Sequence, residues 1–117
     1  MIKVVALLRR REGLSHEEFE SHWRDVHPHY VRALPGVRRY VQSPAVDLPR
    51  KQWPYDGLAE LWFDDVAAVR AAFASAAADP MREDEGRFLE SIDWFLAGEL
   101  VILDTTSPSG TNGTAAN

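Results

Sequence analysis

The 117-residue sequence predicts a single α+β domain whose elements follow the order β-α-β-β-α-β. Short apolar runs of strand length alternate with segments in which apolar residues recur every three or four positions, as in amphipathic helices. Pro-Gly, Asp-Gly and proline-rich stretches separate these segments. This order is the ferredoxin-like split βαβ pattern, in which four antiparallel strands carry their helices on one face.

The first strand is expected over residues 2–9, a short apolar run that ends at Arg-Arg-Arg-Glu-Gly. A helix is expected to follow over 16–26. Ser15 is a good N-cap, and Glu18 lies three residues later, so the two can form a reciprocal capping box. The inward stripe of this helix continues past its end and consists of Phe19, Trp23, Val26 and Tyr30.

Pro28 interrupts this stripe between His27 and His29. A proline in a helix removes a hydrogen bond and disfavours α geometry in the residue before it, so we expect a bend at His27. A short helical continuation should reach about Leu34, where Pro35-Gly36 stops it.

The remaining elements are read from the same signals. Strands are expected at 36–43, 55–63 and 98–104, and residues 44–54, which contain three prolines, read as a loop. The second helix begins after Asp64-Asp65, is interrupted by Asp79-Pro80, and restarts over MREDEGRFLESI. The domain is therefore assigned to 1–104, and the tail 105–117, which has no core-forming residue, is expected to be disordered.

The first and last predicted strands are apolar on both faces, whereas the helices cover only one face of the sheet. The economical cover for the other face is a second copy of the chain, which predicts a two-fold homodimer through the bare sheet face.

Composition and charge argue against several kinds of partner and site. The net charge is −5 and the basic residues are scattered, which argues against nucleic acid. No apolar run approaches the roughly 20 residues of a membrane span, and the N-terminal charges follow the apolar run, so a cytoplasmic protein is expected. The chain has no cysteine, which excludes disulfides, thiolate metal sites and a cysteine nucleophile.

His27 is the first candidate for chemistry, because it shares the inward side of Trp23 at the expected bend. An imidazole held against apolar rings can act as a general acid or base near neutral pH. The alternative is a core histidine bonded to a carbonyl freed by Pro28. His22 and His29 look less suitable, and a zinc site made of all three histidines lacks the spacing of helical zinc motifs.

Alternation on the second strand places Tyr40 on one face with Arg38 and Gln42. If that face looks toward the helices, the phenol points toward His27 and could bond a substrate oxygen or, equally, a loop carbonyl. Glu60 is expected to pair with Arg38 or Arg39 on the neighbouring strand. Asp84, four residues before Phe88, is the acidic residue expected to look inward. No glycine-rich phosphate loop or Gly-x-Ser-x-Gly elbow is present.

The segments ALLRRREGLSHEEFESHWRDVHPHYVRALPGVRRYVQ, YDGLAELWFDD and EDEGRFL resemble the EthD family of dimeric α+β-barrel proteins over about residues 2–104. The resemblance implies a sheet-to-sheet dimer and a pocket between sheet and helices, with neither metal nor organic cofactor. It also implies that His27, Tyr40 and Asp84 occupy the positions of pocket residues in family members that isomerise lactones or cyclise, dehydrate or decarboxylate aromatic polyketides.

The function expected from residues and resemblance together is a cofactor-independent lyase or isomerase for a small aromatic, lactone or polyketide-like substrate. His27 would be the general acid/base, Tyr40 would bond the substrate oxygen, and Asp84 would orient His27 or share the proton. Trp23, Trp62 and Phe88 would form an apolar wall. The alternative is a non-catalytic accessory or hydrophobic-ligand-binding protein that supports an oxygenase pathway. Haem binding is a third reading, which Pro28 and the acidic surroundings disfavour.

Overall fold

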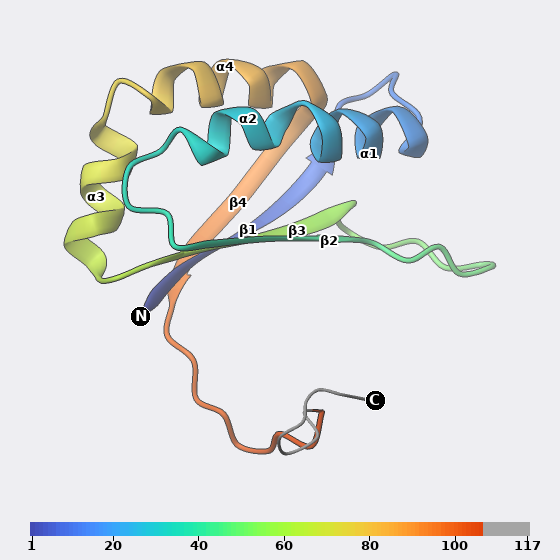
Figure 1. Ribbon diagram of the computed structural model, residues 1–117. Coiled ribbons are helices and arrows are strands. Elements are labelled where there is room, and N and C mark those ends of the chain that lie inside the picture. Colours follow the sequence, from blue (N-terminus) through green and yellow to red (C-terminus); the bar gives the residue numbers. More distant parts are fainter. Residues whose placement is uncertain (107–117) are drawn as a thin grey trace.

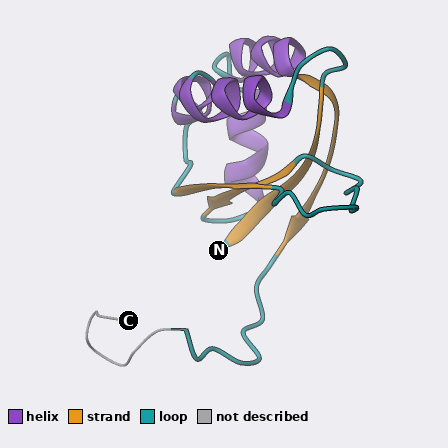
Figure 2. Cartoon of the chain, turned by 90° about the vertical axis from the view of Figure 1, so that its right-hand side faces the viewer, coloured by secondary structure: helices purple, strands orange, loops and turns teal. Residues whose placement is uncertain are grey.

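The computed structural model describes residues 1–106 and arranges four strands and four helices in two layers (Figure 1). The strand order is β2-β3-β1-β4, and each pair of neighbours is antiparallel. The helices all lie on one face of the twisted sheet, as the view turned by 90° also shows (Figure 2). The predicted ferredoxin-like α+β fold is therefore confirmed.

The first strand and helix form as their sequence signals predict. β1 spans Ile2–Arg10 and α1 spans His16–Asp25. The Ser15 hydroxyl accepts a hydrogen bond from the Glu18 backbone N–H at 3.1 Å, and the Glu18 carboxylate accepts one from the Ser15 N–H at 2.9 Å. This capping box fixes the start of α1, so that Phe19 and Trp23 face the sheet and are buried.

The helical break lies at Val26, one residue before the expected bend. α2 spans His27–Arg32, so Pro28 lies in its first turn, where a missing backbone N–H costs no helical hydrogen bond. The Val26 N–H still bonds the His22 carbonyl at 2.9 Å, which closes α1. His27 therefore starts a new helix and is only 5% exposed.

The middle of the chain follows the predicted order. β2 spans Arg39–Pro44, β3 spans Gly57–Phe63, α3 spans Val66–Ala74 and α4 spans Ala78–Phe88. The break between the two helices precedes the predicted one: Asp79 and Pro80 lie in the first turn of α4, where proline is tolerated.

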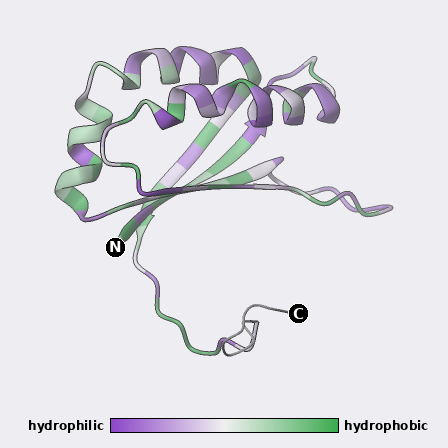
Figure 3. Ribbon diagram, in the orientation of Figure 1, coloured by the Kyte–Doolittle hydropathy of each residue, from purple (hydrophilic) through white to green (hydrophobic). Residues whose placement is uncertain are grey.

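The predicted last strand at 98–104 is wrong. β4 spans Leu89–Ala97 and pairs with β1, with Phe95 opposite Val5. Leu89 adopts extended backbone and ends α4, so residues 89–92, which were assigned to a helix, begin the strand. The apolar run Leu100–Leu103 lies beyond the sheet and is 72–89% exposed (Figure 3). Both stretches are apolar enough for a strand, and pairing with β1 selects Leu89–Ala97.

The two faces of the sheet differ in character. Val4, Ala6 and Leu8 of β1 point to the helices and belong to the core. On the other face, Lys3 bonds Glu60 at 2.6 Å across β1 and β3. Glu60 was expected to pair with an arginine of β2, but Lys3 takes that place, and Arg38 instead bonds Asp64 at 2.8 Å.

The assigned tail, 105–117, lies outside the described residues from 107 onward. Within residues 1–106, no helix has both the length and the apolar character needed to cross a membrane.

Candidate active site

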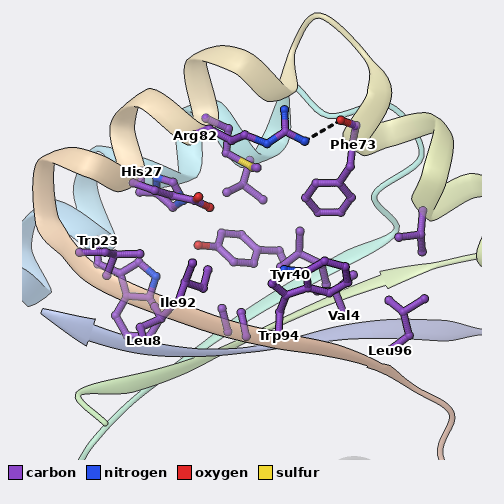
Figure 4. Close-up of a pocket in the computed structure, with 18 of the residues that line it drawn as sticks. Val4, Leu8, Trp23, His27, Tyr40, Phe73, Arg82, Ile92, Trp94 and Leu96 are labelled. Atoms are coloured by element: carbon purple, nitrogen blue, oxygen red, sulfur yellow. Dashed lines mark hydrogen bonds between the residues drawn. The ribbon is translucent and has the colours of Figure 1, made fainter.

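A cavity of about 400 Å³ lies between the inner face of the sheet and the helices. Figure 4 shows His27 and Trp23 at one end and Phe73 and Leu96 at the other, with Tyr40 between them. Arg70, Arg82 and Trp94 line the cavity and are exposed, so it opens to solvent at this side of α3, α4 and the edge strand β4. Most of the lining is apolar, which suits a flat, largely apolar ligand.

His27 reaches the cavity from the first turn of α2. Its Nδ1 lies 2.8 Å from Oδ2 of Asp84, and its ring packs against Phe88 with the ring centroids 4.9 Å apart. Burial lowers the pKa of His27, and the Asp84 carboxylate only partly opposes this effect. The ring is therefore held neutral at neutral pH, which is the form that can accept a proton.

Asp84 lies behind His27 and is completely buried. Its Oδ1 lies 2.9 Å from His22 Nε2 and accepts a hydrogen bond from Arg87 Nη1 at 3.1 Å. Burial alone would raise the pKa of Asp84, but the hydrogen bonds from His27, His22 and Arg87 outweigh it and hold the pKa below its usual value. Asp84 is thus an ionised carboxylate with donors on both oxygens.

This arrangement fixes the tautomer of His27. An ionised carboxylate only accepts hydrogen bonds, so Nδ1 must carry the proton that faces Asp84. The lone pair then lies on Nε2, which has no hydrogen-bond partner among residues 1–106 and is left for a ligand in the cavity that His27 lines. A histidine oriented by a carboxylate in this way has the geometry of a general base.

Tyr40 lies on the inner face of β2 and lines the cavity. Its hydroxyl oxygen accepts a hydrogen bond from Gln42 Nε2 at 2.8 Å, and the same nitrogen donates to the Trp23 carbonyl at 2.7 Å. Because the phenol oxygen accepts from Gln42, its own proton remains available to a ligand. Burial raises the pKa of Tyr40, so the phenol keeps that proton.

The predicted apolar wall is only partly assembled. Trp23 and Phe88 line the cavity, but Trp62 lies on the opposite face of the sheet, under the Arg39 guanidinium at 4.4 Å from its ring centroid. The expectation that Trp62 contacts the same ligand is wrong, because its alternation phase is that of Glu60. Gly57 is required beside Trp23, since a Cβ there would lie 2.7 Å from the indole ring.

Three polar residues of the site were missed from the sequence: His22, Gln42 and Glu85. His22 lies three residues after buried Phe19, so it lies at the margin of the inward stripe and is half-buried. Glu85 lines the cavity and lies four residues after Met81 and three before Phe88, which is the signal for an inward position. His29 is exposed, as expected for a bystander.

Burial raises the pKa of Glu85 from 4.5 to about 7. Between these values the folded protein holds a proton that the unfolded chain releases, so stability falls as the pH rises from about 4.5 to about 7. Glu85→Gln should remove this fall and stabilise the protein at pH 8 by on the order of 2 kcal/mol, less than the full shift implies because the carboxyl is partly exposed.

Urea unfolding at pH 4 and pH 8 measures the effect of Glu85→Gln. The matched change Glu83→Gln, at an exposed carboxylate of the same helix, should leave the pH dependence unchanged. Equal pH dependence of stability in wild type and Glu85→Gln would contradict a raised pKa at this residue.

A metal centre receives no support from the arrangement. Among residues 1–106, no group of three or more histidine or carboxylate side chains has the geometry to hold a metal ion. His22 and His27 instead converge on the single carboxylate of Asp84, while His29 points away from them toward Tyr30, with the ring centroids 5.3 Å apart.

The chain is similar to a known protein family and to several solved structures. The family signature described as "EthD domain" matches residues 11–92. An ethyl tert-butyl ether d (EthD) family protein from Bacillus halodurans has a similar structure, with a TM-score of 0.73, 21% identity, and coverage of 86% of this chain and 99% of that one. HapK from Hahella chejuensis has a TM-score of 0.69 at 18% identity, covering 92% of this chain and 100% of its own.

A dimeric ferredoxin-like protein of unknown function from Thermobifida fusca is also similar, with a TM-score of 0.64 and 16% identity over 84% of this chain and 90% of that one. At these identities the similarity establishes the fold alone. No curated protein matches the sequence.

Proposed function

Because the chain belongs to the EthD family, we propose that its cavity carries out proton-transfer chemistry on a small aromatic, lactone or polyketide-like substrate. The reaction would be that of a lyase or isomerase, of the cyclase, dehydratase or decarboxylase type. The observation that carries the proposal is the 2.8 Å contact between His27 Nδ1 and Asp84, which leaves Nε2 for the ligand. Only side chains take part in the steps.

His27 is the proposed general base. Its Nε2 takes a proton from the carbon beside a substrate carbonyl, and the C–H electron pair becomes a C=C bond while the carbonyl π pair moves to oxygen. The imidazolium that forms is stabilised by Asp84, which is already ionised and in contact with Nδ1. Asp84 is therefore a positioning residue in this scheme.

Tyr40 is the proposed donor to the substrate oxygen. Negative charge develops on that oxygen as the proton leaves carbon, and a phenol already oriented by Gln42 can stabilise it without reorganisation. The surrounding apolar walls, including Trp23 and Phe88, make the surroundings of the phenol less polar than water, which strengthens this hydrogen bond.

A thermal-shift screen of wild type and His27→Ala against lactones, naphthols, anthrones and phenolic ketones tests the proposal, with mass spectrometry of each mixture. We expect ligands that stabilise both proteins and that only wild type converts. Stabilisation of both proteins without conversion by either would overturn the catalytic proposal and favour the accessory or ligand-binding role.

We also propose a homodimer through the outer face of the sheet, as relatives of this fold are described as dimeric. Phe95, opposite Val5 in register, is 52% exposed on that face. The exposed apolar run Leu100–Leu103 continues from the end of β4 on the side of the sheet away from the helices (Figures 1 and 3). Exposed apolar side chains at Phe95 and along Leu100–Leu103 favour a partner that covers them.

Phe95→Asp should raise the dimer dissociation constant at least about 10-fold, because it places a charge in an apolar contact. Sedimentation equilibrium measures the change, with Glu90→Gln on the same strand as control. A wild-type protein that remains monomeric at high micromolar concentration would refute the dimer.

A further inference from the structure

Glu85 is an ionisable side chain on the apolar face of α4 that the scheme above does not use. Met81, Glu85 and Phe88 follow one another at helical spacing, and all three line the cavity. Met81 and Phe88 are buried, at 4% and 1% exposure. A carboxyl in the middle of such a stripe costs stability unless it has a partner or a use.

Glu85 has no such partner among residues 1–106: no hydrogen bond or ion pair there involves its carboxyl. The neighbouring Arg82 does not take that role, since its guanidinium bonds the Phe73 carbonyl at 2.7 Å and Asp79 at 3.4 Å (Figure 4). Asp84, one residue earlier, is by contrast contacted by three side chains. The two adjacent carboxyls therefore differ: one is held as an anion, and the other faces the cavity without a donor.

The charged and titratable groups around Glu85 come from three helices and one strand, and the cavity-lining residues of the other elements are not titratable. Arg82 and Asp84 lie beside it on α4, His27 on α2, Tyr40 on β2 and Arg70 on α3. Burial raises the pKa of Glu85 to about 7; Arg82 opposes this effect and Asp84 adds to it. A substantial fraction of the carboxyl is therefore in its acid form at neutral pH, whereas His27 beside the same cavity is a neutral base.

We propose that Glu85 is the proton donor for the second half of the reaction, giving a proton to the substrate after His27 has taken one from carbon. This inference rests on the proposed function. A neutral acid and a neutral base in one cavity can act at two atoms of the same substrate, which a single histidine can do only by turning or exchanging its proton.

The Glu85 proton can complete either an isomerisation or a dehydration. In an isomerisation, the C=C pair of the dienolate takes the Glu85 proton at the distant carbon, and the carbonyl re-forms. In a dehydration, the Glu85 proton goes to the leaving hydroxyl oxygen, and the C–O pair leaves with water. Each ends with His27 protonated and Glu85 ionised, and the proton returns from His27 to Glu85 through water at the open side of the cavity.

The ketone 3-cyclohexen-1-one separates the two halves. In D₂O, removal of its α-hydrogen appears as deuterium exchange, and protonation at the distant carbon appears as conjugated 2-cyclohexen-1-one; proton NMR follows both. We expect wild type to catalyse both events and His27→Ala to lose both. Glu85→Gln should keep α-exchange within about threefold of wild type and lose at least about 10-fold in conjugation.

The pH profile separates a proton donor from a structural residue. Conjugation by wild type should decline as the pH rises through about 7, and the residual rate of Glu85→Gln should lack this decline. Glu83→Gln, at an exposed carboxylate of α4, should match wild type, and a melting curve for each variant verifies folding.

Different results would overturn the role of Glu85 and the proposed function of the cavity. Wild-type activity in both events, with conjugation and its pH profile unchanged in Glu85→Gln, would overturn the role of Glu85 and leave His27 in place. Absence of both events in wild type would overturn the proposed function, and the role of Glu85 with it.

Discussion

Replacing His27 with alanine should slow the α-deuterium exchange of 2-tetralone, a flat enolisable ketone, by about 100-fold or more. The loss follows from the geometry: Nε2 is the nitrogen left for the ligand, because Asp84 engages Nδ1 at 2.8 Å. Tyr40 would still bond the ketone oxygen, so binding should weaken much less than turnover. Proton NMR gives the exchange rate, and isothermal titration gives the affinity.

His29→Ala is the matched control, since His29 is exposed two residues further along the same helix. It should exchange 2-tetralone at the wild-type rate. If His27→Ala kept the rate within a factor of a few, the assignment of His27 as the general base would be wrong.

Replacing Asp84 with asparagine should lower the free energy of unfolding at pH 7 by roughly 2–4 kcal/mol. Asp84 is completely buried and is contacted by three side chains, and a neutral amide cannot stabilise His22, His27 and Arg87 in the same way. The variant should also lose turnover, because the amide can donate to Nδ1 and so leave the proton on Nε2.

The pH dependence tests the same contact. The pKa of Asp84 is depressed in the folded state, so its contribution to stability is present above the unfolded value of about 4 and is lost as the pH falls through the lower folded value. The stability difference between wild type and Asp84→Asn should therefore be full at pH 7 and shrink below about pH 4. Glu83→Gln should cost little at either pH, and an equally small cost for Asp84→Asn would show that the buried carboxylate contributes nothing.

The local signals that predict most of the fold are those with a short-range physical cause. The Ser15–Glu18 capping box fixes the start of α1 within the chain segment itself. The proline after His27 requires a helix boundary nearby, and the structure places it at Val26. Both follow from a few neighbouring residues, so they can be recognised without knowledge of the rest of the fold.

The wrong predictions concern the last strand and the partner of Glu60, which are set by contacts between distant parts of the chain. Residues 98–104 are apolar enough for a strand, but β1 pairs with Leu89–Ala97, and the apolar run is left outside the sheet. Glu60 pairs with Lys3 rather than an arginine of β2, because the position of β1 beside β3 is a property of the whole sheet. Sequence spacing alone does not contain these choices.

The site shows the same division. His27 and Tyr40 line one cavity, and Asp84 lies directly behind His27. The position of Trp62 depends on which residues of β3 face the helices. It lies on the face of the sheet opposite to the cavity. Asp84 and Glu85 both lie at helical spacing from Phe88, so only the packing of α4 against α2 and the sheet distinguishes the buried anion from the cavity carboxyl.

A crystal structure of the protein with 2-naphthol bound would show whether Tyr40 and His27 together hold an aromatic ligand in the cavity. We expect the ring to lie between the sheet and the helices, packed against Trp23 and Phe88, with the naphthol oxygen within hydrogen-bond distance of the Tyr40 hydroxyl and the carbon beside it facing His27 Nε2. A ligand bound on the outer face of the sheet, or in the cavity with its oxygen turned away from both residues, would contradict it.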